Sequence, residues 1–266
     1  MTRIRPSRPR WRFSKILDKL PCNYCGKIRE LCLSHAIPNA FLKDILRRSG
    51  GAAILLSDGA EKIRRSGDSG KVKLLCAECE QLFNFELDSP AIAFLRSYRN
   101  KINCGIDVSN ACAAPLLLFV MSVVWRASRS TSPAYSGIQL PKKMENAFKA
   151  IIFDAKAVAK IASVRLEDLV DPAIKGGFSR DDLTQIILWP KARRPEKNIE
   201  ISMAFGGFAF RVYLPKLSYP ESKEPCYLRA KPSRIRARKL NVFHYPGFMD
   251  VCVQNRAKHE QGHVTF

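Results

Sequence analysis

Four cysteines near the N-terminus are arranged in two close pairs. Cys22 and Cys25 belong to the sequence CNYC, which Gly26 follows, and Cys76 and Cys79 belong to CAEC. Two residues between ligands let both thiolates of a pair reach one face of a tight turn, and four thiolates complete the tetrahedral coordination of Zn²⁺. The spacing therefore predicts one structural zinc ion that joins two distant turns and contributes directly to folding stability.

The residues around these cysteines form an ordered series of motifs. CNYC is followed by SHAIP at residues 34–38 and then by LLCAECE at residues 74–80. In this order the sequence resembles the HNH, or His-Me finger, endonucleases, over residues 20–90. It is also similar to uncharacterised bacterial proteins that share the cysteine frame and a later SxxWR segment, here residues 122–126. The resemblance implies a zinc-stapled ββα-metal-like module.

That resemblance also implies a mechanism and a set of catalytic residues. In the family a histidine at the end of a strand deprotonates water, and a divalent cation, often Mg²⁺, stabilises the scissile phosphate. His35 matches the histidine position, and a histidine suits the role of general base because the ordinary pKa of an imidazole lies near neutrality. Glu80 follows the last cysteine, where the family often has a metal ligand. Asn84 would share a helix face with it, so both could meet a metal beside His35.

Two positions depart from the family pattern. Ser34 stands before the histidine, where the family usually has Asp, Glu or His, and Glu80 replaces the more usual Asn or His. Either the metal site is rebuilt, with Glu78, Glu86 or Asp88, or catalysis is lost. In the second case His35 would hydrogen-bond a backbone carbonyl and order the zinc module.

A second metal motif is present near the C-terminus. Residues 259–263, HEQGH, fit the HExxH pattern of zinc proteases. That pattern needs a stable helix to place both histidines on one face, and Gly262 interrupts it. We therefore interpret the match as a chance one in a flexible tail. Trp125 and Arg126 are interpreted as a core tryptophan and an arginine that interacts with the helix C-terminus.

The net charge of +21 at neutral pH favours a polyanionic partner. Arginines 3, 5, 8, 10 and 12 form one basic block, and residues 231–239 form another. Nucleic acid is the expected partner, with DNA favoured, and no membrane association is expected. The basic start lacks a following apolar segment and the unpaired cysteines do not resemble a disulfide scaffold, so a cytoplasmic location is expected. Those cysteines, at positions 32, 104, 112, 226 and 252, are expected to be buried.

Hydrophobic periodicity predicts the elements of the N-terminal part. Helices are expected over residues 13–20, from Pro38 to Gly50, from Cys76 or Ala77 to before Pro90, and over residues 91–99. Strands are expected over residues 53–56 and 71–75, with a loop or hairpin tip over residues 57–70.

The remainder is predicted to be mainly helical. Residues 111–165 carry helical spacing, and their apolar run at 111–125 is too short to cross a bilayer comfortably. A helix is expected to start at Ser179, and strands are expected over residues 186–189 and 199–214, with a hairpin at Gly206 and Gly207. Irregular structure is expected from Pro215 onward.

Together these features predict an α+β protein with four parts. They are a basic arm (1–20), a zinc-bound HNH-like module (21–100), a mainly helical body with a β-hairpin (101–215), and a basic, largely irregular segment (216–266). The leading functional hypothesis is an HNH-like metal-dependent endonuclease that hydrolyses phosphodiester bonds, associated with anti-phage defence. The alternatives are a noncatalytic zinc-dependent nucleic-acid-binding protein and a protein-binding subunit of a defence complex.

Overall fold

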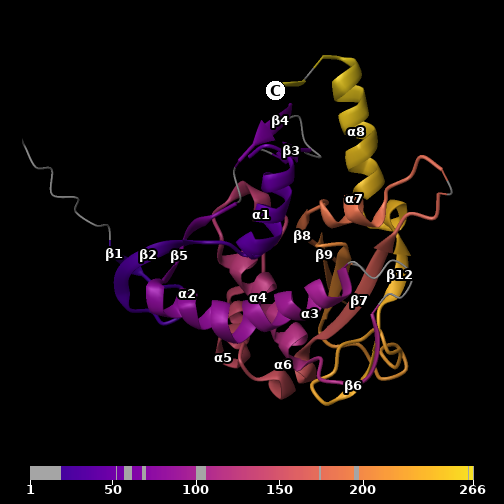
Figure 1. Cartoon of the computed structure of the whole chain (residues 1–266). Helices are drawn as coiled ribbons and strands as arrows, with labels where there is room; N and C mark the ends of the chain where they lie inside the picture. Colours follow the sequence, from indigo (N-terminus) through magenta and orange to yellow (C-terminus); the bar gives the residue numbers. More distant parts are fainter. Residues whose placement is uncertain are drawn as a thin grey trace, which may run out of the picture.

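The computed structural model describes most of the chain (Figure 1). The described residues are 19–51, 53–56, 62–67, 70–99, 106–173, 175–194, 198–262 and 264–265. The basic block at residues 3–12 lies outside them, as do Cys104, His263 and most of the helix expected over residues 13–20. Lys19 and Leu20, at the end of that helix, lie instead in a β-strand.

The N-terminal module is built on a three-stranded antiparallel sheet. Its strands are β1 (Lys19–Pro21), β2 (Ile28–Ser34) and β5 (Val72–Cys76), in the order β1-β2-β5. Helix α2 (Ala77–Phe83) begins directly after β5, as the sequence predicted, with acidic Glu78 and Glu80 in its first turn. Acidic side chains are favoured there by the helix dipole. The strands β2 and β5 and the helix α2 thus form a strand–strand–helix unit.

A helix and a small sheet are inserted between β2 and β5. Helix α1 (Asn39–Arg48) buries Phe41, Leu42 and Ile45 on one face, in agreement with the predicted helix. Strand β3 (Ala53–Leu55) pairs with β4 (Ile63–Ser66), so the expected loop over 57–70 contains a strand. The C-terminal strand β13 (Val264–Thr265) adds to β4 in parallel.

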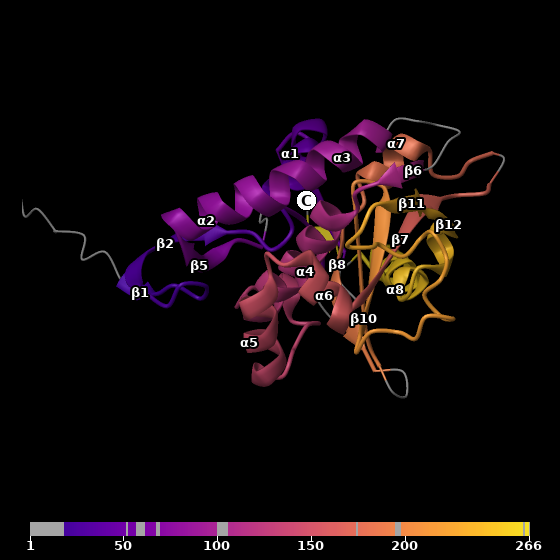
Figure 2. The same ribbon diagram turned by 90° about the horizontal axis from the view of Figure 1, so that it is seen from below.

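The helix that begins with α2 does not end before Pro90. It continues through a π-helical turn (Asn84–Asp88) into α3 (Ser89–Arg99), and both views show one long rod (Figures 1 and 2). A proline inside a helix removes one backbone donor. The π-turn just before Pro90 alters the hydrogen-bond ladder at this point, which accommodates the proline. The predicted break is therefore wrong.

Helix α4 (Ala114–Arg129) forms the centre of the hydrophobic core. Eleven of the twelve residues from Leu116 to Ala127 are buried, and Leu118 is the exception. This confirms the predicted internal helix from Ala114 onward, whereas Ala111 belongs to a strand. None of the helices in the described residues is long and apolar enough to cross a membrane. Helices α5 (Lys142–Ile151) and α6 (Ala155–Ile161) pack beside it. A 3-10 turn at Pro133–Tyr135 lies between α4 and α5 in the sequence.

A five-stranded sheet, with the order β12-β7-β10-β9-β8, forms the other half of the molecule. Its Gly206–Gly207 turn joins β9 and β10 in the predicted hairpin, while β7 begins where helix was expected, at Ser163. The body is therefore a mixed α+β structure rather than mainly helical. The strands are β7 (Ser163–Val170), β8 (Leu188–Arg193), β9 (Ile199–Phe205), β10 (Phe208–Leu214) and β12 (Arg238–Asn241).

The C-terminal segment is more regular than the sequence indicated. Its basic block forms β11 (Ser233–Arg236), which pairs with β6 (Asp107–Ala111), and the strand β12. Helix α8 (Phe248–Glu260) follows, so His259 and Glu260 lie on a helix and not in a flexible tail. Val242, Tyr245 and Phe248 are buried against the sheet, which explains the order in this segment. Helix α7 (Arg180–Thr184) starts at Ser179 with a capping box, as predicted.

Candidate metal centre and the adjacent ionic network

The two cysteine pairs come together in space. The sulfur atoms of Cys22, Cys25, Cys76 and Cys79 all lie within 4.8 Å of one another. The Sγ atoms of Cys25 and Cys76 are 3.8 Å apart, and a tetrahedron with Zn–S bonds of about 2.3 Å has edges of about 3.8 Å. The cluster therefore fits one tetrahedral zinc ion, and four thiolate ligands would leave no position for substrate.

Backbone hydrogen bonds shape the first cysteine turn. Gly26 has a φ of +75°, which glycine adopts without strain, and its N–H donates to the Cys22 carbonyl at 2.8 Å. The N–H of Asn23 donates to the Leu74 carbonyl at 3.2 Å, which ties this turn to β5. The Cys76 N–H in turn donates to the Cys22 sulfur at 3.3 Å. The main chain thus holds both pairs in place.

The same environment favours an ionised sulfur at Cys22. Burial opposes ionisation of this thiol, but the N–H groups of Cys76, Cys25 and Tyr24 outweigh burial and lower its pKa to about 7. At Cys79, burial and the neighbouring thiols raise the pKa. A metal cation at the centre of the cluster would allow Cys79 to ionise as well as Cys22, because a thiol that binds a metal loses its proton.

An aromatic cluster connects the cysteine turn to the core. Tyr24 contacts Phe83 and Trp125 edge-on, with ring centroids 5.1 and 6.1 Å apart, and Phe153 lies 5.8 Å away. Such pairs stabilise beyond the area that they bury. The metal centre is therefore attached to α2 and α4. Among the other cysteines, Cys226 is buried as expected, but Cys112 is exposed.

His35 directly follows the last residue of β2, at the strand end that the resemblance implied. The preceding residue, Ser34, is buried, and its hydroxyl donates to the Glu80 carboxylate at 2.5 Å. Glu80 and Asn84 are four residues apart in a continuous helical segment. Asn84 is exposed, and its side-chain oxygen accepts a weak hydrogen bond from Ser89 at 3.4 Å. The structure thus brings Ser34, the residue before His35, together with Glu80.

The acidic residues considered as replacement ligands lie in different environments. Glu78 is exposed and forms an ion pair with Arg29, and Glu86 is exposed. Asp88 is buried, and Arg126 occupies both of its carboxylate oxygens. Asp88 is therefore unsuited to binding a metal. In the described part of the chain, the cysteine cluster is the only group of three or more His, Cys, Asp or Glu residues placed to hold an ion.

Arg126 has a role that the sequence analysis missed. Its side chain turns into the protein, 2% exposed, instead of interacting with the end of its helix. It donates to Asp88 and to the His35 carbonyl, the latter at 3.2 Å. Burial opposes its charge, yet the carboxylates of Asp88 and Glu80 raise its pKa above the ordinary value. The one sequence signal was that this arginine directly follows the apolar run of α4, four residues after Ser122, to which it also donates.

Comparison with known proteins adds no relative to this description. No protein-family profile matches the chain, and neither a curated protein nor a solved structure shows a significant match to it.

Proposed function

We propose that this protein is an HNH-like, metal-dependent endonuclease that cleaves nucleic-acid phosphodiester bonds. The observation that carries the proposal is the contact between Ser34 and Glu80 at 2.5 Å. These are the two positions where the family that the sequence resembles places metal ligands. They meet at the end of β2, in a strand–strand–helix unit that also carries the four-cysteine cluster.

The residues would divide the work in the following way. The His35 imidazole would accept a proton from the attacking water. Carboxylate and amide oxygens are the ligands that Mg²⁺ prefers, so Glu80 and Asn84 would hold the cation. When bound, that cation would polarise the phosphate and offset charge in the transition state. Arg126 would fix the main chain at His35 through its hydrogen bond to the carbonyl oxygen.

A noncatalytic zinc-stapled nucleic-acid-binding protein is the second candidate. It is favoured because the nearby carboxylates already accept hydrogen bonds from protein side chains. One oxygen of Glu80 accepts from Ser34, and both oxygens of Asp88 accept from Arg126. Under this hypothesis the net charge of +21 provides the affinity for nucleic acid, and no hydrolysis occurs.

A plasmid-nicking assay with Mg²⁺ or Mn²⁺ separates the two candidates. We expect the native chain to nick DNA and His35→Ala to lose at least about 100-fold in rate, which is typical for removal of a general base. His259→Ala is the matched control, because it removes an exposed histidine on α8. Equal cutting by both variants would reject His35 as the base. Binding without cutting by the native chain would favour the noncatalytic candidate.

A further inference from the structure

The five-stranded sheet has one apolar face and one mixed face. Alternate residues of β10, such as Phe208 and Phe210, pack into the core that contains α4. The intervening Arg211 points to the opposite face, where it lies across from Ser202 on β9 and Arg165 on β7. The mixed face, which carries Arg211, therefore lies on the opposite side of the sheet from α4 and Arg126.

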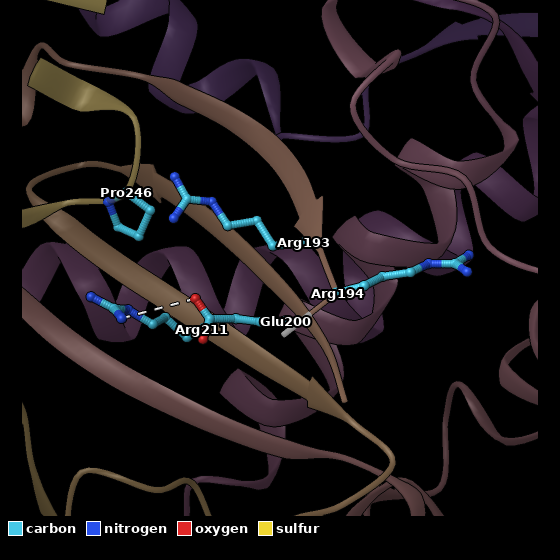
Figure 3. Close-up of a pocket in the computed structure, with 5 residues that line it drawn as sticks. All are labelled: Arg193, Arg194, Glu200, Arg211 and Pro246. Atoms are coloured by element: carbon cyan, nitrogen blue, oxygen red, sulfur yellow. Dashed lines mark ion pairs between the residues drawn. The ribbon is translucent and has the colours of Figure 1, made fainter. Parts of the chain in front are cut away.

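A cleft of about 460 Å³ lies on this mixed face, near the end of β8. It is lined by Arg193 and Arg194 at the end of β8, Glu200 on β9, Arg211 on β10 and Pro246 before α8. Figure 3 shows the guanidinium groups of Arg193 and Arg211 extending toward Pro246, whereas the side chain of Arg194 points away. Two cationic groups thus converge on one hollow.

The carboxylates on this face do not neutralise its arginines. Arg165 and Arg211 lie directly opposite each other, and both bind the same buried carboxylate, Glu167, at 2.9 Å. Glu200 is 3.9 Å from Arg211, at the limit of an ion pair. Arg193 forms no ion pair with any residue in the described part of the chain. The cleft therefore carries an excess of positive charge.

The first turn of α8 borders the same cleft. A Cβ added at Gly247, the N-cap residue, would lie 3.7 Å from the Nη2 atom of Arg193. No side chain caps this helix end, and the amino end of a helix favours anions. Asp250 in the first turn offsets part of this effect.

We propose that the cleft formed by Arg193, Arg211 and the start of α8 binds a phosphate group of a nucleic-acid backbone. Guanidinium groups suit this ligand because their planar donors match phosphate oxygens. The site does not depend on cleavage at His35, since it lies on the other face of the sheet. A free mononucleotide would offer the same phosphate chemistry and is the other source to distinguish.

Fluorescence anisotropy with a labelled DNA oligonucleotide tests the site in the full-length chain. We expect Arg193→Gln to weaken binding about tenfold and to reduce the slope of log K against log salt by about 1, the effect of one lost phosphate contact. Arg194→Gln is the matched control. Arg194 also borders the cleft, but its guanidinium group points away from those of Arg193 and Arg211 (Figure 3), so removal of the same charge there should cost less than about twofold.

Two results would overturn the proposal. Equal losses in Arg193→Gln and Arg194→Gln would mean that the overall charge, and not the cleft, binds DNA. Calorimetric binding of AMP that requires Arg193, with unchanged oligonucleotide affinity, would assign the cleft to free nucleotides instead. Arg193 is exposed and unpaired among the described residues, so its replacement should leave folding intact, which circular dichroism would check.

Discussion

Arg126 and Asp88 form a bidentate ion pair inside the protein. The Nη1–Oδ2 distance is 2.9 Å and the Nη2–Oδ1 distance is 2.6 Å, and both side chains are almost fully buried. The pair joins α4 to the π-turn, and Arg126 also donates to the His35 carbonyl. One interaction between residues far apart in the sequence thus connects the core helix to two segments of the N-terminal module.

We expect removal of one partner of this pair to destabilise the fold strongly. Asp88→Leu would leave the Arg126 charge buried without a counter-charge, and this should lower the free energy of unfolding by about 3–5 kcal/mol. Urea unfolding measures the change. The double variant Arg126→Met with Asp88→Leu should lose less than either single variant, because it removes both buried charges. Additive losses in this double-mutant cycle would contradict the assignment.

The sequence predicted elements whose determinants are local. The spacing of the cysteines predicted their cluster, and the capping residues at Ser179 and the glycines at 206 and 207 predicted a helix start and a hairpin. The cap and hairpin signals lie within a few residues of the structures that they specify. The two cysteine pairs are far apart in the sequence, but each pair is itself a local CxxC motif that indicates a metal ligand.

Elements that depend on distant contacts were missed. The charged residues of β7, Arg165 and Glu167, hid a buried strand, because they pair with each other and Glu167 also binds Arg211 on β10. Asp88 was considered as a metal ligand because its partner, Arg126, is 38 residues away. The order of residues 242–248 depends on a sheet face that no local pattern shows.

We expect purified protein to contain about one zinc ion per chain, measured by elemental analysis. Cys79→Ser should remove the metal and lower the free energy of unfolding by about 3–5 kcal/mol, because metal binding to a structural site is coupled to folding. Cys112→Ser is the control, since Cys112 is exposed and outside the cluster. Full zinc content in Cys79→Ser, or equal losses in both variants, would contradict the four-cysteine centre.

The contact between Ser34 and Glu80 predicts that a Ser34→Asp variant gains thermal stability when a divalent cation is added. Ser34→Asp would place a second carboxylate against Glu80, and without metal the repulsion should cost about 1–3 kcal/mol. Added Mn²⁺ should restore the thermal stability, because two carboxylates can share a cation. Ser34→Ala, which only loses the hydrogen bond, should show no such recovery. An identical response to Mn²⁺ in both variants would mean that the two positions cannot form a metal site.

Tyr213 predicts a loss of stability in alkaline solution. Burial raises its pKa to about 12, against the opposing charge of Arg165, whereas an unfolded tyrosine titrates near pH 10. The folded state therefore holds the proton more tightly. This contribution to stability is complete below about pH 10 and is lost as the pH rises toward about 12.

Urea unfolding of Tyr213→Phe should show a smaller decline in the free energy of unfolding between about pH 10 and 11 than the native chain. Tyr219→Phe, which changes an exposed tyrosine, should decline like the native chain, and the same decline in all three proteins would disprove the assignment.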